Sequence, residues 1–199
     1  MMERTTDEAI TPAAYRAFQE AYDFFNAELF GGSLPHVLVT LQRHGKARGY
    51  FSPERFTGRT DDAAAHELAM NPDSFNGRSD ELILSTLAHE MAHVWQQSHG
   101  IPPRRSYHDR QWAAKMKEIG LQPTATGEPG GKETGQHVTH YIIPGAIGLQ
   151  NAKPRRRGRG CKSTGVERIG LYDPSGAVFT PVSRQEKTDQ AEDRYRSVG

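Results

Sequence analysis

Hydrophobic residues recur every three or four positions in three parts of this chain, which is the spacing of an amphipathic helix. The clearest series is Tyr15, Phe18, Tyr22, Phe25 and Leu29, because capping and terminating residues flank it. The pattern predicts three helices, which begin at Thr11, at Ser79 and at His108 or Asp109, and end at Gly31, at about Ser98 and at Gly120.

Shorter stretches, rich in β-branched residues or alternating between apolar and polar ones, predict strands. They cover residues 36–41, 49–51 and 65–70, with one more strand within 137–149. Further along, residues 166–172 and 177–182 flank a turn at 173–176 and predict a C-terminal β-hairpin. The segment 122–134 is rich in Gly, Pro and Thr, so a loop or linker is expected there.

Composition narrows the class of protein. Only 35% of the 199 residues are hydrophobic and the mean hydropathy is −0.73, which indicates that part of the chain is tail or linker. No apolar run approaches the roughly 20 residues of a membrane span, and the acidic N-terminus lacks the apolar core of a secretory signal. We therefore expect no membrane association and a cytoplasmic or nucleoid-associated protein. The single cysteine, Cys161, excludes an internal disulfide framework.

The formal net charge of +1 is an average over two unlike halves. Residues 1–100 hold 8 basic and 14 acidic side chains, whereas residues 101–199 hold 17 and 10. Much of the basic excess lies in one run, made up of Lys153, Arg155, Arg156, Arg157 and Arg159. This run is interpreted either as a sequence-independent DNA contact or as a solvated linker without a partner.

The second predicted helix carries the segment His89-Glu90-Met91-Ala92-His93, which has the pattern H-E-x-x-H. Two histidines four residues apart lie on the same side of a helix and can bind one Zn²⁺ through their ring nitrogens. The glutamate beside the first histidine can act as general base toward a water that the metal activates. The segment therefore predicts a catalytic metal site.

A helical wheel, with about 100° per residue, separates these histidines from the apolar residues of the same helix. With His89 at zero, His93 lies near 40°, on the side of Ser85, Thr86 and Gln96. The apolar residues fall between roughly 120° and 260° on the same wheel: Ile83, Leu84, Leu87, Ala88, Met91, Val94 and Trp95. This stripe is expected to face the core. The alternative for the histidines is that they are solvated surface residues.

A catalytic zinc site needs a third protein ligand, and three residues are candidates. His99 is rejected, because a ligand at its spacing needs a glycine where this chain has Gln96. Glu118 lies on what is expected to be an exposed helix face. His108 is preferred, because it follows the turn at Pro102-Pro103 and opens the next helix.

Nearby polar residues have more than one interpretation. His137 and His140 lack a third partner for a second metal site, so they are mainly interpreted as ordinary polar residues on a strand. His140, Tyr141 and Tyr107 are also alternative candidates for stabilising an oxyanion near the metal, and the sequence does not choose among them.

Several segments around the motif occur together in one protein family. They are residues 24–26, 29–32, 34–35, 49–51, 71–72, 85–93 and 108–112. Through them the chain resembles the SprT-like (Spartan-type) zinc metalloproteases over about residues 15–122. The resemblance implies a small zincin-like α+β domain at residues 1–122. It implies one Zn²⁺ held by His89, His93 and His108, with Glu90 as the catalytic acid/base.

The resemblance also implies cleavage of proteins bound or crosslinked to DNA. Many family members add a zinc ribbon built from cysteines, and the lone Cys161 leaves such a second zinc unsupported. Residues 123–150 are expected to form a linker and a strand, and residues 151–199 the basic segment, the β-hairpin and a polar tail.

The main hypothesis is thus a zinc-dependent endopeptidase that acts on protein substrates near DNA, with DNA contacted through the basic C-terminal half. Two alternatives stay open. One is a nucleic-acid-binding accessory protein whose zinc only stabilises the fold, and the other is a zinc peptidase unrelated to DNA.

Overall fold

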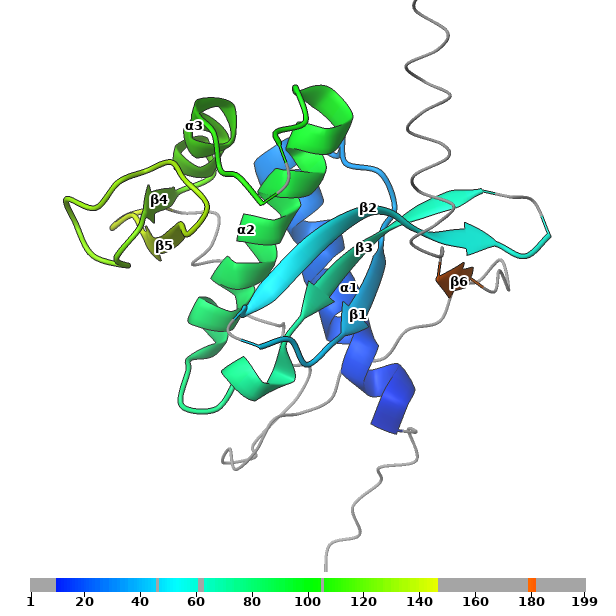
Figure 1. The fold of residues 1–199 in the computed structure, drawn as a ribbon. Coiled ribbons are helices and arrows are strands. Elements are labelled where there is room, and N and C mark those ends of the chain that lie inside the picture. The colour runs from blue at the N-terminus through cyan, green and yellow to red at the C-terminus, as the bar shows by residue number, and fades with distance from the viewer. Residues whose placement is uncertain (1–9, 46, 61–62, 105, 147–178, 182–199) are drawn as a thin grey trace, which may run out of the picture.

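A four-stranded mixed sheet forms one layer of the structure, a computed structural model that describes residues 10–45, 47–60, 63–104, 106–146 and 179–181 (Figure 1). The strand order is β1-β3-β2-β6. Strand β1 runs parallel to β3, and the other neighbours pair antiparallel. The strands are β1 (Leu38–Leu41), β2 (Gly49–Gly58), β3 (Ala64–Met70) and β6 (Phe179–Pro181).

Three α-helices of the described residues complete the main body (Figure 1). They are α1 (Ile10–Phe30), α2 (Asp80–His99) and α3 (Arg110–Glu118), and a short 3-10 helix, η1 (Pro72–Ser74), precedes α2. Helix α2 is central, because it contacts α1, α3 and the strands β2 and β3. The architecture is α+β, as predicted.

The helix ends agree closely with the sequence expectations. Ser79 caps α2 by accepting a hydrogen bond from the Leu82 amide, and Gly100 follows the last helical residue. Asp109 caps α3 through the Trp112 amide. These caps satisfy amides that have no partner within the helix, so short polar residues fix where α2 and α3 begin.

Strand β2 is much longer than the predicted strand at residues 49–51. The sequence after Phe51 contains Pro53 and charged residues, which interrupt the apolar pattern. The structure absorbs this interruption with a register shift between Ser52 and Phe56, where Glu54 has a positive φ of 48°. A β-bulge of this kind lets pairing continue past an irregular segment.

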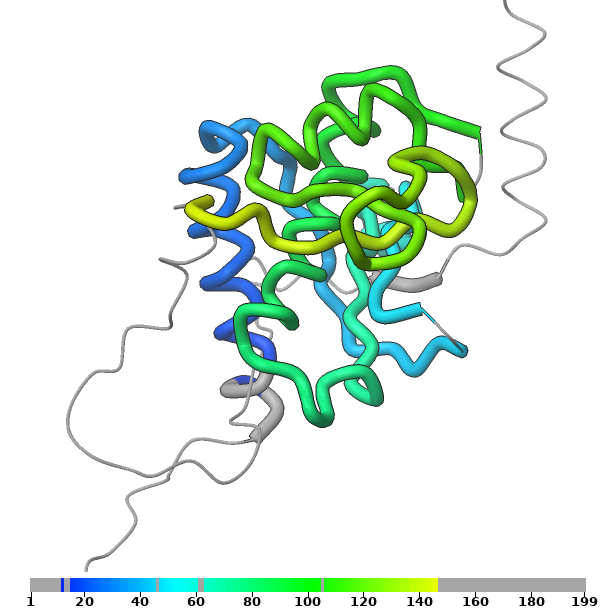
Figure 2. The backbone as a smooth tube through the Cα atoms, turned by 90° about the vertical axis from the view of Figure 1, so that its left-hand side faces the viewer, coloured from blue at the N-terminus to red at the C-terminus, as the bar shows by residue number. Residues whose placement is uncertain are grey.

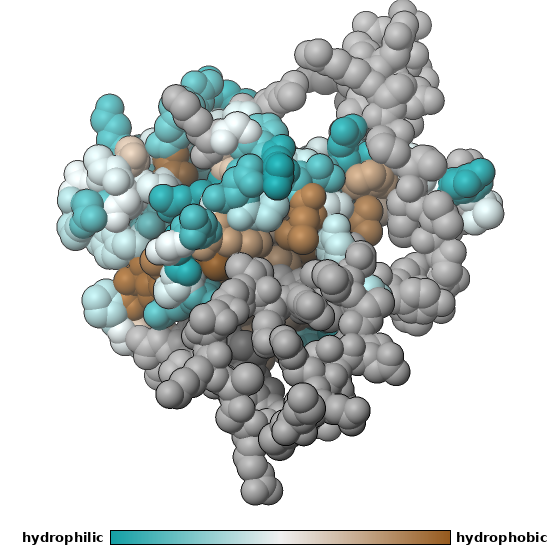
Figure 3. All heavy atoms as spheres, turned by 90° about the horizontal axis from the view of Figure 1, so that it is seen from below, coloured by the Kyte–Doolittle hydropathy of each residue, from teal (hydrophilic) through white to brown (hydrophobic). Residues whose placement is uncertain are grey.

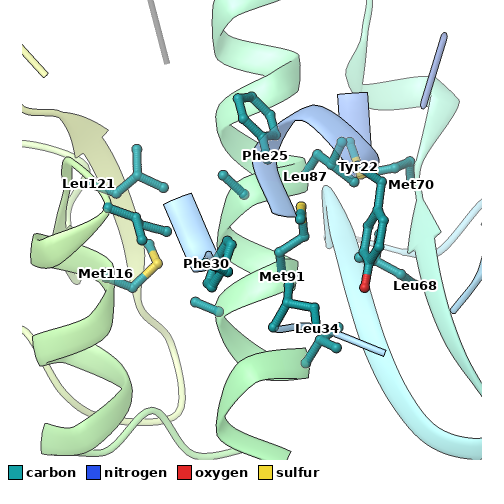
Figure 4. Close-up of a cluster of buried hydrophobic side chains, with 14 of the residues drawn as sticks. Tyr22, Phe25, Phe30, Leu34, Leu68, Met70, Leu87, Met91, Met116 and Leu121 are labelled. Carbon is teal, nitrogen blue, oxygen red and sulfur yellow. The ribbon is translucent and has the colours of Figure 1, made fainter. Parts of the chain in front are cut away.

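The hydrophobic core lies on both sides of α2 (Figure 4). On one side, Leu87 and Met91 lie near Leu68 and Met70 of β3, and aromatic residues of α1 complete this part. On the other side, Met116 of α3 joins the same cluster of buried side chains. The centre of the apolar stripe is thus buried as expected, whereas Ile83, Leu84 and Trp95 are only partly buried.

A second, two-stranded sheet covers part of α2. It consists of β4 (Leu121–Thr124) and β5 (Thr139–Ile142), which pair antiparallel. Figure 2 shows this segment, in yellow-green, crossing in front of α2 below α3. The expectation of a loop throughout residues 122–134 was wrong for 122–124. Pro123 is tolerated in β4 because, among the described residues, this strand pairs on one edge only, with β5. No second neighbouring strand there needs the backbone N–H that proline lacks.

The predicted C-terminal elements fall mostly on residues outside the described ranges. Most of the predicted hairpin, residues 166–178, and the whole basic run at 153–159 lie outside the described residues. The described part, β6, pairs with β2 from Phe56 to Gly58 and so extends the main sheet.

Among the described residues, no helix has the length and apolarity needed to cross a bilayer. Figure 3 shows apolar residues on the lower face in separate patches among polar ones.

Candidate metal centre

Helix α2 brings His89 and His93 to one side. Their rings are 5.4 Å apart, which follows from the i, i+4 spacing within an unbroken helix. The helix continues through Gln96 to His99, so no break redirects the chain after the motif. The partners of these two histidines must therefore come from other elements.

His108 comes to the site from the connection between α2 and α3. Its backbone forms an isolated β-bridge with Gly135, with amide-to-carbonyl distances of 2.8 and 2.9 Å. Its ring nitrogen Nδ1 lies 3.1 Å from the same Gly135 carbonyl oxygen. Since a carbonyl can only accept, Nδ1 carries the proton and Nε2 keeps a free lone pair. Gly135 has a φ of 142°, which side-chain-bearing residues rarely adopt.

Among the described residues, these three histidines lie close enough together to hold a metal ion. One ring nitrogen from each of His89, His93 and His108 lies within 4.8 Å of the others. His108, the candidate that the sequence preferred, is therefore placed where a third ligand is needed. His99 is exposed at the end of α2, and Glu118 is an exposed partner of Lys115 at 2.7 Å. Neither belongs to the cluster.

Trp112 of α3 forms the floor of this cluster. Its indole is fully buried and stacks on the His93 ring at 5.1 Å, with an interplanar angle of 16°. The His89 and His108 rings meet it edge-on at 4.9 and 4.4 Å. Because one rigid side chain touches all three rings, the packing of α3 on α2 sets their relative positions.

Burial keeps the three imidazoles neutral. Desolvation lowers the pKa of His89 well below its ordinary value, and the neighbouring histidines lower it further. The pKa of His93 falls to about 3, mainly through burial and then through His108. Burial also lowers the pKa of His108, although its hydrogen bond to Gly135 opposes this effect. A neutral ring with a free lone pair is the form that binds a metal, so the donor set fits a divalent cation such as Zn²⁺.

Glu90 lies beside the cluster and is 6% exposed. Burial raises the pKa of its carboxyl group to about 8. Within the described part of the chain, no side chain or amide donates a hydrogen bond to this carboxylate. A carboxyl group whose pKa is near neutral pH can both accept and release a proton there, which general acid/base chemistry requires.

Gly49, the first residue of β2, lies directly against this carboxyl group. A methyl group at Gly49 would come within 3.1 Å of Cγ and 3.2 Å of Oε1 of Glu90. It would also come within 2.9 Å of the Ala69 carbonyl oxygen, which is backbone and cannot move aside. The glycine therefore lets the sheet approach the helix at the position of Glu90.

Most of the polar side of α2 is buried, contrary to the alternative in which both histidines are solvated, and of the two only His93 keeps a partly exposed side chain. Ser85 and Gln96 are fully buried, Thr86 is 4% exposed and His89 is 8% exposed. Gln96 donates two hydrogen bonds of 2.9 Å to the Asp109 carboxylate, which also caps α3. The sequence could not show this burial, because it results from the tertiary packing of α3 and β5 on this side of α2.

His140 of β5 also reaches the centre. Its Nδ1 lies 3.0 Å from Nδ1 of His89, and its Nε2 lies 3.0 Å from Oγ of Ser85. His137 is exposed, so the two do not form a second metal site. Of the other oxyanion candidates, Tyr107 packs against the Arg104 guanidinium at 4.2 Å and Tyr141 lies on β5 beside Gln122.

Comparison with known proteins gives one family and one relative. A Salmonella typhimurium protein, described as an uncharacterized protein in the mucB 3′ region, is 47% identical over 58 residues. That match covers 29% of this chain and 78% of the relative. No solved structure matches the chain.

The profile of the SprT-like family matches residues 18–137, which is more than half of the chain and includes the three clustered histidines and Glu90. This match supports a metallopeptidase-type function that depends on a metal. We conclude that the chain belongs to the SprT-like family.

Proposed function

We propose that this protein is a zinc-dependent endopeptidase of zincin type. The observation that carries the proposal is the cluster of His89, His93 and His108, whose ring nitrogens lie within 4.8 Å of one another beside the buried Glu90. Three neutral imidazoles leave a fourth position for water or substrate, as in catalytic rather than structural zinc sites.

The three histidines would hold the ion, and Glu90 would move the proton. When bound, the zinc ion supplies a Lewis acid that polarises water and the scissile carbonyl, and its charge favours the ionised form of Glu90. Glu90 then takes the proton of the attacking water and delivers it to the departing amine nitrogen. Gly49 keeps space beside the carboxyl group for this exchange.

The proposed substrates are proteins bound or crosslinked to DNA. Two features support this: membership in the SprT-like family, and the basic run with Lys153, Arg155, Arg156, Arg157 and Arg159. This run can neutralise several phosphates without reading the base sequence. The proposal therefore includes a salt-dependent DNA contact outside the metal centre.

The test is cleavage of casein and of a DNA-binding protein by the zinc-loaded full chain. Reactions contain no DNA, single-stranded DNA or double-stranded DNA, each at two salt concentrations. We expect cleavage of the DNA-binding protein to increase with DNA and to weaken at the higher salt concentration. Glu90→Gln should retain zinc and lose activity by at least about a hundredfold, because general acid/base catalysis contributes that much.

The outcomes separate the parts of the proposal. Wild-type protein without stoichiometric zinc contradicts the metal centre, and full activity in Glu90→Gln contradicts the peptidase, leaving zinc as a stabiliser of the fold. Cleavage of short peptides that ignores DNA contradicts only the DNA-bound substrate. Replacing the five basic residues by glutamine should abolish stimulation by DNA, with the reaction lacking DNA as the reference.

A further inference from the structure

Two hydrogen bonds place His140 between the proposed metal centre and the body of α2. Its Nδ1 lies 3.0 Å from Nδ1 of His89, and its Nε2 lies 3.0 Å from Ser85 Oγ. Ser85 is fully buried and lies four residues before His89 on the same helix. Both ring nitrogens of His140 are therefore used, although this residue comes from a strand 51 positions away in sequence.

The Ser85 hydroxyl, at the end of the hydrogen-bonded series His89–His140–Ser85, determines the direction of these hydrogen bonds. The Ser85 hydroxyl donates to the Leu82 carbonyl oxygen at 3.0 Å, so its oxygen accepts a proton from His140 Nε2. A neutral imidazole has one N–H, and Nδ1 of His140 is then an acceptor. It accepts from Nδ1–H of His89, which leaves Nε2 of His89 with a free lone pair.

The opposite direction would disable the centre. If Ser85 donated to His140, then His140 would donate to Nδ1 of His89, and the proton of His89 would sit on Nε2. A protonated Nε2 cannot bind a metal. The direction that the Ser85–Leu82 hydrogen bond selects is thus the one that His89 needs as a ligand.

His108 provides an internal comparison, because its Nδ1 is held by the Gly135 carbonyl at 3.1 Å and its Nε2 is free. A second partner that orients a ligand histidine is common at metal sites, where it is usually a carboxylate, carbonyl or water. At His89 the corresponding partner is another histidine, whose own tautomer has to be fixed. Ser85 performs that task.

We propose that His140 is a positioning residue, which together with Ser85 holds His89 in the tautomer whose Nε2 binds the metal. This inference rests on the proposed metal centre. It also means that His140 has no free nitrogen for an oxyanion, so Tyr107 and Tyr141 remain as the candidates for that role.

The first test measures zinc affinity of the full chain by competition with a chromophoric chelator. His140→Ala should weaken zinc binding by about 10- to 100-fold, the usual effect of losing such a partner. His140→Asn should restore most of this affinity, since the Asn Oδ1 can replace Nδ1 as acceptor. Ser85→Ala should show a smaller loss. His99→Ala, which removes an exposed histidine from the same helix, is the control.

The second test reads the tautomers directly by ¹⁵N NMR of histidine-labelled protein, with and without zinc. We expect an Nδ1–H signal for His89 and an Nε2–H signal for His140 in both states. In His140→Ala we expect the Nδ1–H signal of His89 to be lost. A wild-type His89 with its proton on Nε2 overturns the inference. Unchanged zinc affinity in His140→Ala, or an Asn variant no better than Ala, also overturns it.

Failure of the proposed function looks different. A wild-type protein that binds no zinc contradicts the metal centre, while the NMR spectra of the zinc-free protein still report the two tautomers. Zinc binding by wild type together with equal affinity in His140→Ala contradicts the role of His140 alone.

Discussion

The two sides of α2 are both buried, but different interactions hold them. On one side Leu87 and Met91 pack against the sheet and α1, where any well-shaped apolar surface can cover them. On the other side Ser85, His89 and Gln96 are buried by α3 and β5, and each makes a specific hydrogen bond. Buried polar groups require such partners, so this side specifies positions as well as contacts.

The two sides of α2 contribute differently to the stability of the fold and to metal binding. The apolar side provides free energy of folding that does not depend on a metal. The polar side carries desolvated imidazoles and a carboxyl group with a raised pKa, which oppose folding in the absence of a cation. Substitutions on the two sides should therefore separate stability from metal binding.

The largest effect is expected on the polar side, for His108→Ala. Without the ligand from the α2–α3 connection, two histidines remain, and zinc affinity should fall by more than about a hundredfold. Chelator competition measures this change, and circular dichroism of the zinc-free protein should show an intact fold.

Two controls sharpen this prediction. Glu118→Gln and His99→Ala remove the other ligand candidates, which are exposed and outside the cluster, so both variants should bind zinc like wild type. Loss of zinc in Glu118→Gln with retention in His108→Ala would reverse our assignment of the third ligand.

On the apolar side, Met91→Ala should lower the free energy of unfolding by about 2–5 kcal/mol. Met91 is fully buried between the sheet and α1, and its truncation leaves a cavity. Urea unfolding of the zinc-free protein measures the loss. Zinc-bound protein should lose a similar amount, because no metal contact changes; a loss confined to the zinc-bound form would contradict the separation of the two sides.

The raised pKa of Glu90 predicts a pH-dependent difference between zinc-free wild type and Glu90→Gln. The folded protein keeps its proton up to about pH 8, whereas the unfolded chain releases it near the ordinary value of 4.5. Between these values the unfolded state binds fewer protons, so wild-type stability falls as pH rises.

The difference should reach at most about 3.5 kcal/mol at pH 7, since pH 7 is 2.5 units above the ordinary pKa of 4.5 and each unit corresponds to about 1.4 kcal/mol. Parallel unfolding curves at pH 5, 6, 7 and 8 test it, with Glu90→Gln as the variant that cannot titrate at this position. Equal pH dependence in the two proteins would show that Glu90 is not desolvated as described.

Much of this centre was predictable from local sequence. Caps at Ser79 and Asp109 and the wheel of α2 depend on neighbours in the chain, and the structure confirms these elements. The choice of His108 over His99 also used local features, namely an unbroken helix and a Pro-Pro turn. Position along one helix or turn is the information that a single sequence carries best.

The missing parts depend on contacts between distant segments. The burial of Ser85 and Gln96 comes from elements that follow in the chain, and polar residues on a helix give no sign of them. From the sequence, His140 was one of several candidates for stabilising an oxyanion. Its contact with His89 depends on the register of β5, which places it against a residue 51 positions earlier in the chain. The length of β2 was missed because a bulge carries it past Pro53.

The smallest predicted effect concerns the link between the two regions. Asp109 caps α3 through the Trp112 amide and accepts both hydrogen bonds from buried Gln96, whose Oε1 has no partner among the described residues. Asp109→Asn can still cap α3, so the free energy of unfolding should fall by only about 1 kcal/mol. Asp109→Ala removes the cap and leaves the Gln96 amide unpaired, and should cost about twice as much.

Since Asp109 directly follows His108, the Ala variant should also bind zinc more weakly than the Asn variant. Equal zinc affinity in the two variants, measured by chelator competition, would show that the His108–Gly135 bridge alone positions this ligand.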